Sequence, residues 1–117
     1  MRNFHALVVW QKSHQLTLKI YLITLKFPKE ELYGLISQIR RSSSSIPTNI
    51  AEGCGRNSNA EMKRFLIISS GSASELEYQL LLARDLNYIS EVSYKELSDL
   101  TIEIRKMIYS FIKSIPT

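Results

Sequence analysis

Residues that cross-link a chain or interrupt its helices are scarce in this sequence. Its 117 residues include one cysteine, four glycines and three prolines. Because Cys54 has no partner of its own kind, no disulfide can form within the chain, which is typical of a reducing cytoplasm. The glycines and prolines stand mostly at the ends of periodic apolar segments, where a helical bundle needs them.

Long apolar runs are also missing. No stretch of about 18 uncharged apolar residues is present, so the sequence predicts no transmembrane helix. Residues 13–25 come nearest, but Lys19 interrupts them. The apolar run at residues 6–10 is too short for the hydrophobic region of a signal peptide. We therefore expect a cytoplasmic protein without a membrane partner.

Motifs for metal binding and catalysis are equally few. His5 and His14 are the only histidines, and both stand far from Cys54 in the sequence. The glycines around Cys54 lack the spacing and the Lys-Ser/Thr pair of a phosphate-binding loop. The sequence thus predicts no metal, no cofactor and no enzyme active site.

The residues that are present are typical of an ordinary globular domain, since 44% are hydrophobic and 22% are charged. Four segments carry apolar residues at alternating spacings of three and four, which is the period of a helix packed on one face. Short links between long helices favour antiparallel neighbours. We predict an all-α fold, an antiparallel up-down-up-down four-helix bundle, with residues 1–117 as one domain.

The first predicted helix spans residues 8–27 and ends before Pro28, because a proline disfavours the helical conformation of the preceding residue. Apolar residues surround much of this helix, more than one bundle face needs. Surplus apolar surface is typical of an interface, so we expect a homo-oligomer.

The second predicted helix begins near Leu32 or Tyr33. It ends at residues 53–55, where a glycine suits the left-handed position that follows many helices.

Pro47 and the serines at residues 42–45 argue against a continuous second helix. The buried stripe nevertheless keeps its phase from Ile39 to Ile50, so we predict one helix kinked at the proline. Nearby serine hydroxyls would satisfy the carbonyl of Ser43, which the proline leaves free. Small serines would also let a neighbouring helix approach closely.

The third predicted helix opens at Ser58 or Asn59 and ends near Asn87. Glu61 stands three residues after Ser58, which is the spacing of a capping box. Gly71 lies inside the helix, and we expect it to permit close approach of another helix.

The fourth predicted helix begins near Ser93, with Glu96 three residues later as a second capping box. Pro116 closes it.

Positive charge is concentrated in the first half of the chain. Residues 1–64 carry ten Lys/Arg against four Asp/Glu, whereas residues 65–117 carry five against seven. Such a surface suits nucleic acid, the acidic half of a neighbouring copy, or solvent alone. The cations that we single out as candidate nucleic-acid contacts are Arg40, Arg41, Arg56, Lys63 and Arg64.

Polar residues near these cations favour a structural interpretation over acid–base catalysis. Glu61 in a first helical turn complements the helix dipole. Glu52 and Glu75 are placed to pair with an arginine, so the basic side chains are alternatively structural. We assign structural roles to four polar residues: Asn49, Glu52, Glu61 and Glu75.

Motifs along nearly the whole chain carry a family resemblance. They are residues 9–12 (VWQK), Tyr21, residues 27–28 (FP), 33–41 (YGLISQIRR), 45–53 (SIPTNIAEG), 55–56 (GR), Glu61, 65–66 (FL), 71–72 (GS) and 75–76 (EL). The chain resembles the bacterial four-helix bundle proteins encoded by intervening sequences in 23S ribosomal RNA genes. It departs at Ser42 and Ser43, where the family often has alanines, and at residues 87–88, where a Leu-Gly-Tyr turn is common.

What this resemblance implies is a four-helix bundle and a ring of five identical subunits. A distantly similar bundle is the accessory variability protein of retroelements, which is pentameric and binds nucleic acid. The resemblance implies no catalytic residues. We therefore expect a homo-oligomer associated with RNA or DNA, or alternatively an interaction scaffold whose basic patch serves ring assembly.

Overall fold

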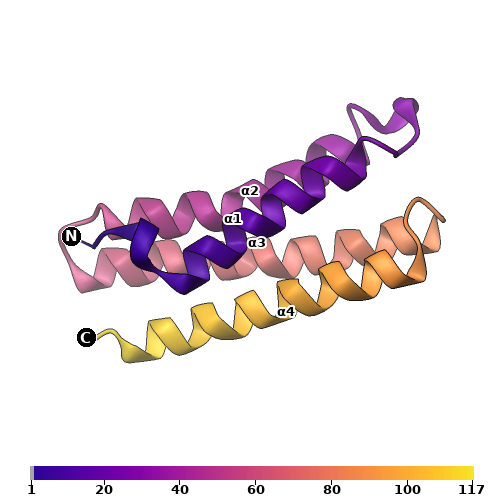
Figure 1. Cartoon of the computed structure of the whole chain (residues 1–117). Coiled ribbons are helices and arrows are strands. Elements are labelled where there is room, and N and C mark those ends of the chain that lie inside the picture. Colours follow the sequence, from indigo (N-terminus) through magenta and orange to yellow (C-terminus); the bar gives the residue numbers. More distant parts are fainter. Residues whose placement is uncertain (1) are drawn as a thin grey trace.

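The computed structural model describes residues 2–117, and four long helices dominate it (Figure 1). Each helix packs against its neighbours in the chain and α1 also packs against α4, whereas the backbones of the diagonal pairs α1–α3 and α2–α4 stay more than 8 Å apart. This arrangement confirms the antiparallel four-helix bundle, and residues 2–117 contain no strand. The elements are η1 (Phe4–Ala6), α1 (Val8–Thr24), η2 (Lys29–Glu31), α2 (Leu35–Cys54), α3 (Asn59–Asp85) and α4 (Glu91–Ser114).

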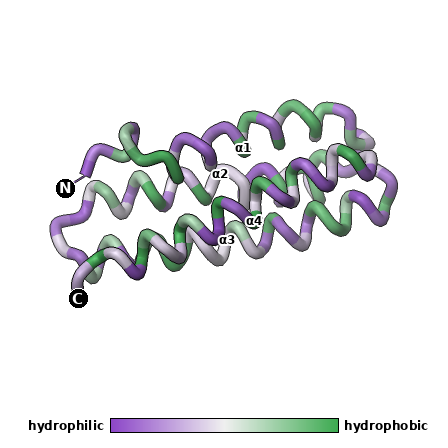
Figure 2. Tube along the Cα trace, turned by 60° about the horizontal axis from the view of Figure 1, so that its bottom comes forward, coloured by the Kyte–Doolittle hydropathy of each residue, from purple (hydrophilic) through white to green (hydrophobic). Residues whose placement is uncertain are grey.

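The interior of the bundle is apolar, and its helices each present a hydrophobic stripe to it. Figure 2 shows hydrophobic and hydrophilic residues alternating along every helix. The largest side chains with no exposed surface come from all four helices, among them Leu16, Ile39, Leu76 and Ile104. Within residues 2–117, no helix is both long enough and apolar enough to cross a membrane.

The connection between α1 and α2 is longer than predicted. Helix α1 ends at Thr24, three residues before the expected limit, and α2 begins at Leu35 instead of residues 32–33. Glu31 supplies the reason for the later start, since its Oε1 accepts a hydrogen bond of 3.3 Å from the backbone N–H of Leu35. The other oxygen of Glu31 accepts one of 2.9 Å from the Tyr88 hydroxyl, which ties this connection to the link before α4.

Helix α2 passes through Pro47 without interruption, as predicted. The carbonyl of Ser43, which lacks a partner at position 47, accepts a hydrogen bond of 2.9 Å from Thr17 Oγ1 of α1. The prediction that serine hydroxyls would satisfy this carbonyl is therefore wrong, because Ser43 Oγ and Ser44 Oγ donate to carbonyls three residues earlier. A neighbouring helix replaces the bond that proline removes.

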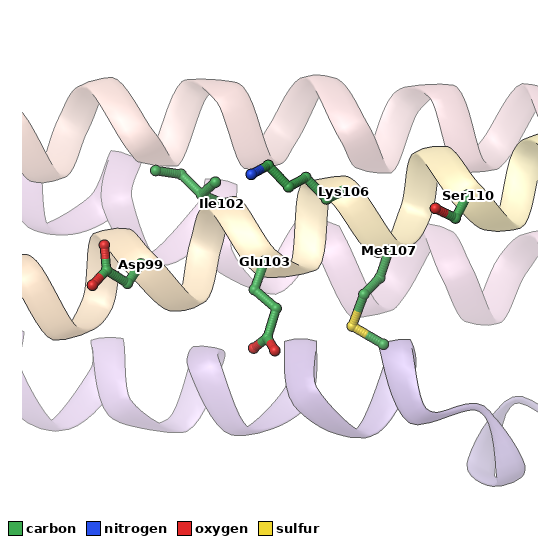
Figure 3. A pocket seen from close by; sticks show the side chains of 6 residues that line it. All are labelled: Asp99, Ile102, Glu103, Lys106, Met107 and Ser110. Carbon is green, nitrogen blue, oxygen red and sulfur yellow. The ribbon is translucent and has the colours of Figure 1, made fainter.

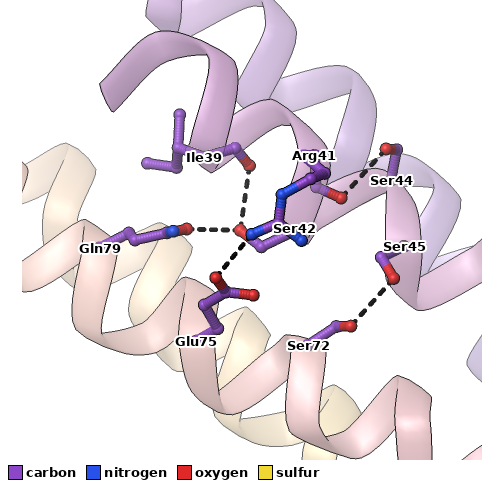
Figure 4. A network of polar contacts seen from close by, with 8 residues as sticks. All are labelled: Ile39, Arg41, Ser42, Ser44, Ser45, Ser72, Glu75 and Gln79. Carbon is purple, nitrogen blue, oxygen red and sulfur yellow. Dashed lines mark hydrogen bonds and ion pairs between the residues drawn. The ribbon is translucent and has the colours of Figure 1, made fainter. Parts of the chain in front are cut away.

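Helices α2 and α3 approach each other along a seam of buried hydroxyl groups (Figure 4). Ser69 Oγ donates to the Ile46 carbonyl at 2.9 Å. Ser72 Oγ donates to Ser45 Oγ at the same distance. Ser42 Oγ donates to Gln79 Oε1. The predicted role of small serines in close helix packing is thus confirmed.

The two helical glycines behave differently from one another. A Cβ at Gly53 would lie 3.1 Å from Met62 Sδ and 3.2 Å from Phe65 Cβ, so the close approach of α2 and α3 leaves little room for a larger residue there. A Cβ at Gly71 would have no neighbour within 4 Å. The prediction that Gly71 permits close packing is wrong within one chain, because the residue faces outward.

The prediction of a left-handed glycine after the second helix is wrong. No glycine in residues 2–117 has a positive φ, and Gly55 follows α2 with φ −84°. The left-handed residue is Asn87, at φ 64°. Its position lets the Tyr88 N–H donate to the Ala83 carbonyl at 2.9 Å, which closes α3 with a Schellman motif.

Serine caps open α3 and α4. Ser58 Oγ accepts from the Glu61 N–H at 3.1 Å, which confirms the predicted start of α3. In α4 the cap is Ser90, whose Oγ accepts from the Ser93 N–H at 3.1 Å. The helix therefore begins before Ser93, and Glu96 makes no capping box but pairs with Lys19.

Candidate nucleic-acid interface

The five predicted cations fall into two separate groups. Arg40 and Arg41 lie in the second turn of α2, whereas Arg56, Lys63 and Arg64 surround the turn between α2 and α3. The two groups are separated along the length of α2, so they do not form one surface.

Arg40 is half-buried between α1 and α2. Its Nε donates to Thr24 Oγ1 at 2.8 Å. Its guanidinium carbon also lies 4.8 Å from the centre of the Tyr21 ring, where a cation–π contact is favourable. These contacts hold the side chain against α1.

Arg41 is engaged on the opposite flank of α2 (Figure 4). Its guanidinium pairs with Glu75 of α3 at 2.6 Å. Because both side chains are about half exposed, the pair adds little to stability. It nevertheless occupies the arginine with a carboxylate of the same chain, which is the structural alternative expected from the sequence.

Two of the three remaining cations, Arg56 and Arg64, pack on Phe65 near the start of α3. The guanidinium carbons of Arg56 and Arg64 lie 4.7 Å and 4.6 Å from the centre of its ring. Glu61 binds Arg64 at 3.0 Å and approaches Arg56 to 4.0 Å. Glu52 binds Arg56 at 3.3 Å. Two carboxylates and one aromatic ring therefore fix the directions of both arginines.

Asn49 and Lys63 complete the set of predicted residues. Asn49 Nδ2 donates to the carbonyl and the hydroxyl of Ser45, at 2.8 Å and 2.9 Å, and so stays within α2. Lys63 forms no ion pair within the part of the chain that the structure describes, which leaves its ammonium free for a ligand.

The fold separates charge along the axis of the bundle. Both chain ends and the α2–α3 turn lie at one end, which we call the basic end (Figure 1). Its charged side chains are Arg2, Arg56, Lys63, Arg64 and Lys113, with Glu52 and Glu61 as the carboxylates. At the opposite end, which we call the acidic end after its four carboxylates, they are Lys26, Lys29, Arg40 and Arg84, with Glu30, Glu31, Asp85 and Glu91.

Sequence reasoning missed Arg2 and Lys113 as members of the basic end. Backbone bonding of Arg2 to the Cys54 carbonyl, at 2.9 Å, places the N-terminal segment against the end of α2. Lys113 lies in the last turn of α4. An antiparallel bundle brings these positions together although they stand far apart in the sequence, so the signal was the topology and not a motif.

No arrangement typical of catalysis accompanies these cations. A hollow of about 620 Å³ lies along α4, and Figure 3 shows its lining residues on that one helix. Its carboxylates are already paired, Asp99 with Lys95 and Glu103 with Lys12. Residues 2–117 hold no group of three or more His, Cys, Asp or Glu side chains placed to bind a metal. Burial raises the pKa of the Cys54 thiol, which disfavours a reactive thiolate.

Comparisons with known proteins agree with the bundle and its motifs. No curated protein matches the chain. A crystal structure from Bacteroides thetaiotaomicron, described as a protein of unknown function from the S23 ribosomal protein family, is 31% identical with a TM-score of 0.84. That similarity covers 92% of this chain and 96% of the other. The model of the 23S rRNA-intervening sequence protein family matches residues 5–110. The chain therefore belongs to the 23S rRNA-intervening sequence protein family.

Proposed function

We propose that this protein is a non-enzymatic, self-associating protein that binds RNA through the basic end of its bundle. The separation of charge along the bundle carries the proposal. Five cationic side chains face two carboxylates at the basic end, whereas four face four at the acidic end. A polyanion would meet a favourable potential at the first end and a weaker one at the second.

Phosphate groups are the part of RNA that this end would contact. Lys63 has no ion pair within residues 2–117, and Arg64 keeps 58% of its side chain exposed although Glu61 holds its Nε. Such cations displace counterions from the nucleic acid, so binding weakens steeply as salt rises and depends little on sequence. RNA is the first ligand to test because the family is described by the 23S rRNA intervening sequence.

The test measures RNA binding by fluorescence anisotropy over a salt series from about 50 to 200 mM. Changing Lys63 and Arg64 together to Glu should weaken binding and lower the slope of log K against log salt by roughly two. The matched control changes Lys26 and Lys29 of the acidic end to Glu and should leave the slope unchanged. No binding at the lowest salt concentration would refute the proposal.

Arg40 and Arg41 stay in the proposal as a separate prediction. Because Thr24 and Glu75 already hold them, changing both to Gln should weaken RNA binding less than the change at Lys63 and Arg64. A larger loss would move the interface to the middle of α2.

Self-association rests on a different observation, the apolar residues left exposed on α1 and α3. On α1 and the residue that follows it, Leu18, Leu22 and Leu25 are 52–73% exposed and stand four and three residues apart. On α3, Ile67 and Tyr78 are about 60% exposed. These two helices occupy diagonal corners of the bundle. A contact between α1 of one copy and α3 of the next is therefore heterologous, and such contacts form a ring where the rotation between copies closes, as in the pentamer that the family resemblance implies.

Gly71 supports the same contact. It lies on the exposed stripe between Ile67 and Tyr78, at spacings close to one and two helical turns. A glycine inside a helix costs about 1 kcal/mol relative to alanine. Nothing within the chain needs this glycine, since a Cβ there would touch nothing. A neighbouring copy packed closely on α3 would explain why this position is a glycine.

Gly71→Arg tests self-association because it should break the oligomer without unfolding the chain. The position is exposed, a Cβ there meets no obstacle and arginine is a better helix former, so the dissociated chain should stay folded. The oligomer should dissociate toward the 13.5 kDa chain, as measured by light scattering. Gln38→Arg, at an exposed position of α2, is the control and should keep the oligomer. A wild-type protein that is monomeric at micromolar concentration would contradict the proposal.

A further inference from the structure

A groove between α1 and α2 lies next to the basic end and combines two kinds of wall. Its volume is about 580 Å³. The side chains that matter are the rings of Phe4, Trp10 and His14 on one wall, and Ser44, Thr48 and Glu52 on the other.

The aromatic wall offers a flat stacking surface. The rings of Trp10 and His14 are nearly parallel, with an interplanar angle of 7° and centroids 5.2 Å apart. Phe4 packs on Trp10 at 4.8 Å and steadies it from the side of η1. Trp10 is half-buried because Phe4, His5 and His14 all pack on it, whereas His14 is exposed, so the accessible ring surface of the groove belongs to the Trp10–His14 stack as a unit. Base–aromatic stacking is the main attraction in many single-strand binding proteins.

The polar wall is a single ridge of α2. Ser44, Thr48 and Glu52 stand four residues apart and therefore on one face of the helix. The Thr48 hydroxyl and Glu52 Oε2 have no hydrogen-bond partner within residues 2–117, whereas Glu52 Oε1 binds Arg56. A free hydroxyl thus stands one helical turn from a carboxylate that can still accept hydrogen bonds.

We infer that this groove holds one unpaired guanine base of RNA, an inference that rests on the RNA binding proposed above. The base packs on the exposed surface of the Trp10–His14 stack. Its N1–H and N2–H groups donate to the carboxylate of Glu52, and its O6 accepts from the Thr48 hydroxyl. The adjoining phosphate lies toward Arg56, which follows Glu52 by one turn at the basic end.

The carboxylate is what selects guanine among the bases. A carboxylate only accepts hydrogen bonds, so it needs two neighbouring donors on the edge that it meets. Guanine is the only common base with two adjacent donors on its Watson–Crick edge. Adenine, cytosine and uracil each place an acceptor beside their donor, which would face the negative oxygens. Such an edge is accessible only in an unpaired base, so the groove discriminates against duplex RNA.

The first experiment uses Trp10 itself, because it is the only tryptophan of the chain. Purified protein is titrated at low salt with a short oligouridine and with the same oligomer carrying one central guanosine. We expect the guanosine oligomer to quench tryptophan fluorescence and to bind roughly tenfold more tightly, as one matched base contact provides. A hairpin of the same length with its guanines paired should bind without quenching.

Two variants and their controls test the contributions of the aromatic wall and the polar wall separately. Glu52→Gln should remove the preference for guanosine and keep the salt dependence, whereas Glu30→Gln at the acidic end should change neither. Trp10→Leu should weaken binding of the guanosine oligomer roughly tenfold, as expected for the loss of one stacked base. Its control is Tyr33→Leu, which removes an aromatic ring that is 94% exposed at the other end of the bundle.

The outcomes distinguish this inference from the broader proposal. Salt-dependent binding with no tryptophan quenching and equal affinity for both oligomers would overturn the guanine groove and leave RNA binding by the basic end intact. An unchanged guanosine preference in Glu52→Gln would overturn it as well. Absence of any RNA binding at low salt would overturn both.

Discussion

Helices α2 and α4 are held in the same bundle by different chemistry. On both flanks of α2, buried hydroxyl groups donate to its backbone or side chains, from Thr17 on one side and Ser69 on the other. The polar links of α4 to α1 are exposed ion pairs, Lys19–Glu96 at 2.9 Å and Lys12–Glu103 at 3.1 Å.

The difference shows how residue size sets the spacing of helices. Serine and glycine leave room for close approach, and hydrogen bonds then form across the seam. Where long charged side chains bridge two helices, the space between them stays open. A groove of about 510 Å³ accordingly lies along α1 and α4, lined in part by Leu22, Leu25 and Leu97. We expect the seams of α2 to control stability and those of α4 to contribute little.

Ser69→Leu should have the largest effect on this contrast. Ser69 has no exposed surface and its hydroxyl bonds the Ile46 carbonyl. A leucine would force α2 and α3 apart and remove that bond, lowering the free energy of unfolding by about 3 kcal/mol. Urea denaturation measures the change, and Ser110→Leu on the exposed face of α4 is the control, expected within about 0.5 kcal/mol of the parent. Equal losses of stability in the two variants would show that the α2–α3 seam is no more sensitive to a larger residue than the exposed face of α4.

Thr17→Val should have the next largest effect, because it removes the hydroxyl that bonds the free carbonyl of Ser43. The expected loss is about 1 kcal/mol. In a Pro47→Ala background, the new N–H of residue 47 can satisfy that carbonyl, so the same change should cost less. A double-mutant cycle by urea denaturation measures this coupling. Equal losses in both backgrounds would show that the threonine does not replace the bond lost at the proline.

Lys19→Met should have a small effect, since it removes one exposed ion pair of α4. The lysine and Glu96 side chains are 45% and 61% exposed, so we expect a loss below about 0.5 kcal/mol that shrinks as salt rises. Denaturation at low and high salt checks this. A loss above about 1 kcal/mol would mean that ion pairs stabilise α4 as strongly as hydroxyl groups stabilise α2.

Ionisation of Cys54, at the end of α2, should leave the stability of the fold unchanged at neutral pH and lower it measurably in alkali. Burial raises the pKa of its thiol above that of the unfolded chain. Below the unfolded pKa, both states hold the proton and stability is unaffected. As pH rises from the unfolded toward the folded pKa, only the unfolded chain loses the proton, so stability falls. Denaturation of wild type and Cys54→Ala from pH 7 to alkaline pH checks this, and parallel curves would contradict it.

The helices were predictable because their apolar spacing is regular, and even the continuity of α2 through Pro47 could be anticipated from the phase of its stripe. The partner of the freed carbonyl could not, because Thr17 reaches it from another helix. Local pattern also misplaced the start of α4, since Ser90 and Ser93 both fit a cap and only the length of the preceding turn decides between them. Asn87 took the left-handed position that a glycine was expected to fill elsewhere.

The candidate site was less predictable than the fold. Sequence identified Arg56, Lys63 and Arg64, but it could not show that Phe65 and Glu61 would hold the two arginines. It grouped Arg40 and Arg41 with them because all five lie in the basic first half of the sequence. The fold then separates the two groups along the length of α2. The groove beside Trp10 escaped notice because its two walls come from different helices.

The elongated shape of the bundle has a consequence for how much nucleic acid one chain would cover. The molecule measures 44 × 24 × 20 Å, and the basic side chains that we propose to contact RNA lie at one end of the long axis. A protein that contacts RNA with that end presents its cross-section and not its length. At about 3.4 Å per nucleotide step, the footprint of a single copy would be roughly seven steps instead of thirteen. Nuclease protection would then reveal short, evenly repeated intervals, one for each copy of the chain that touches the strand.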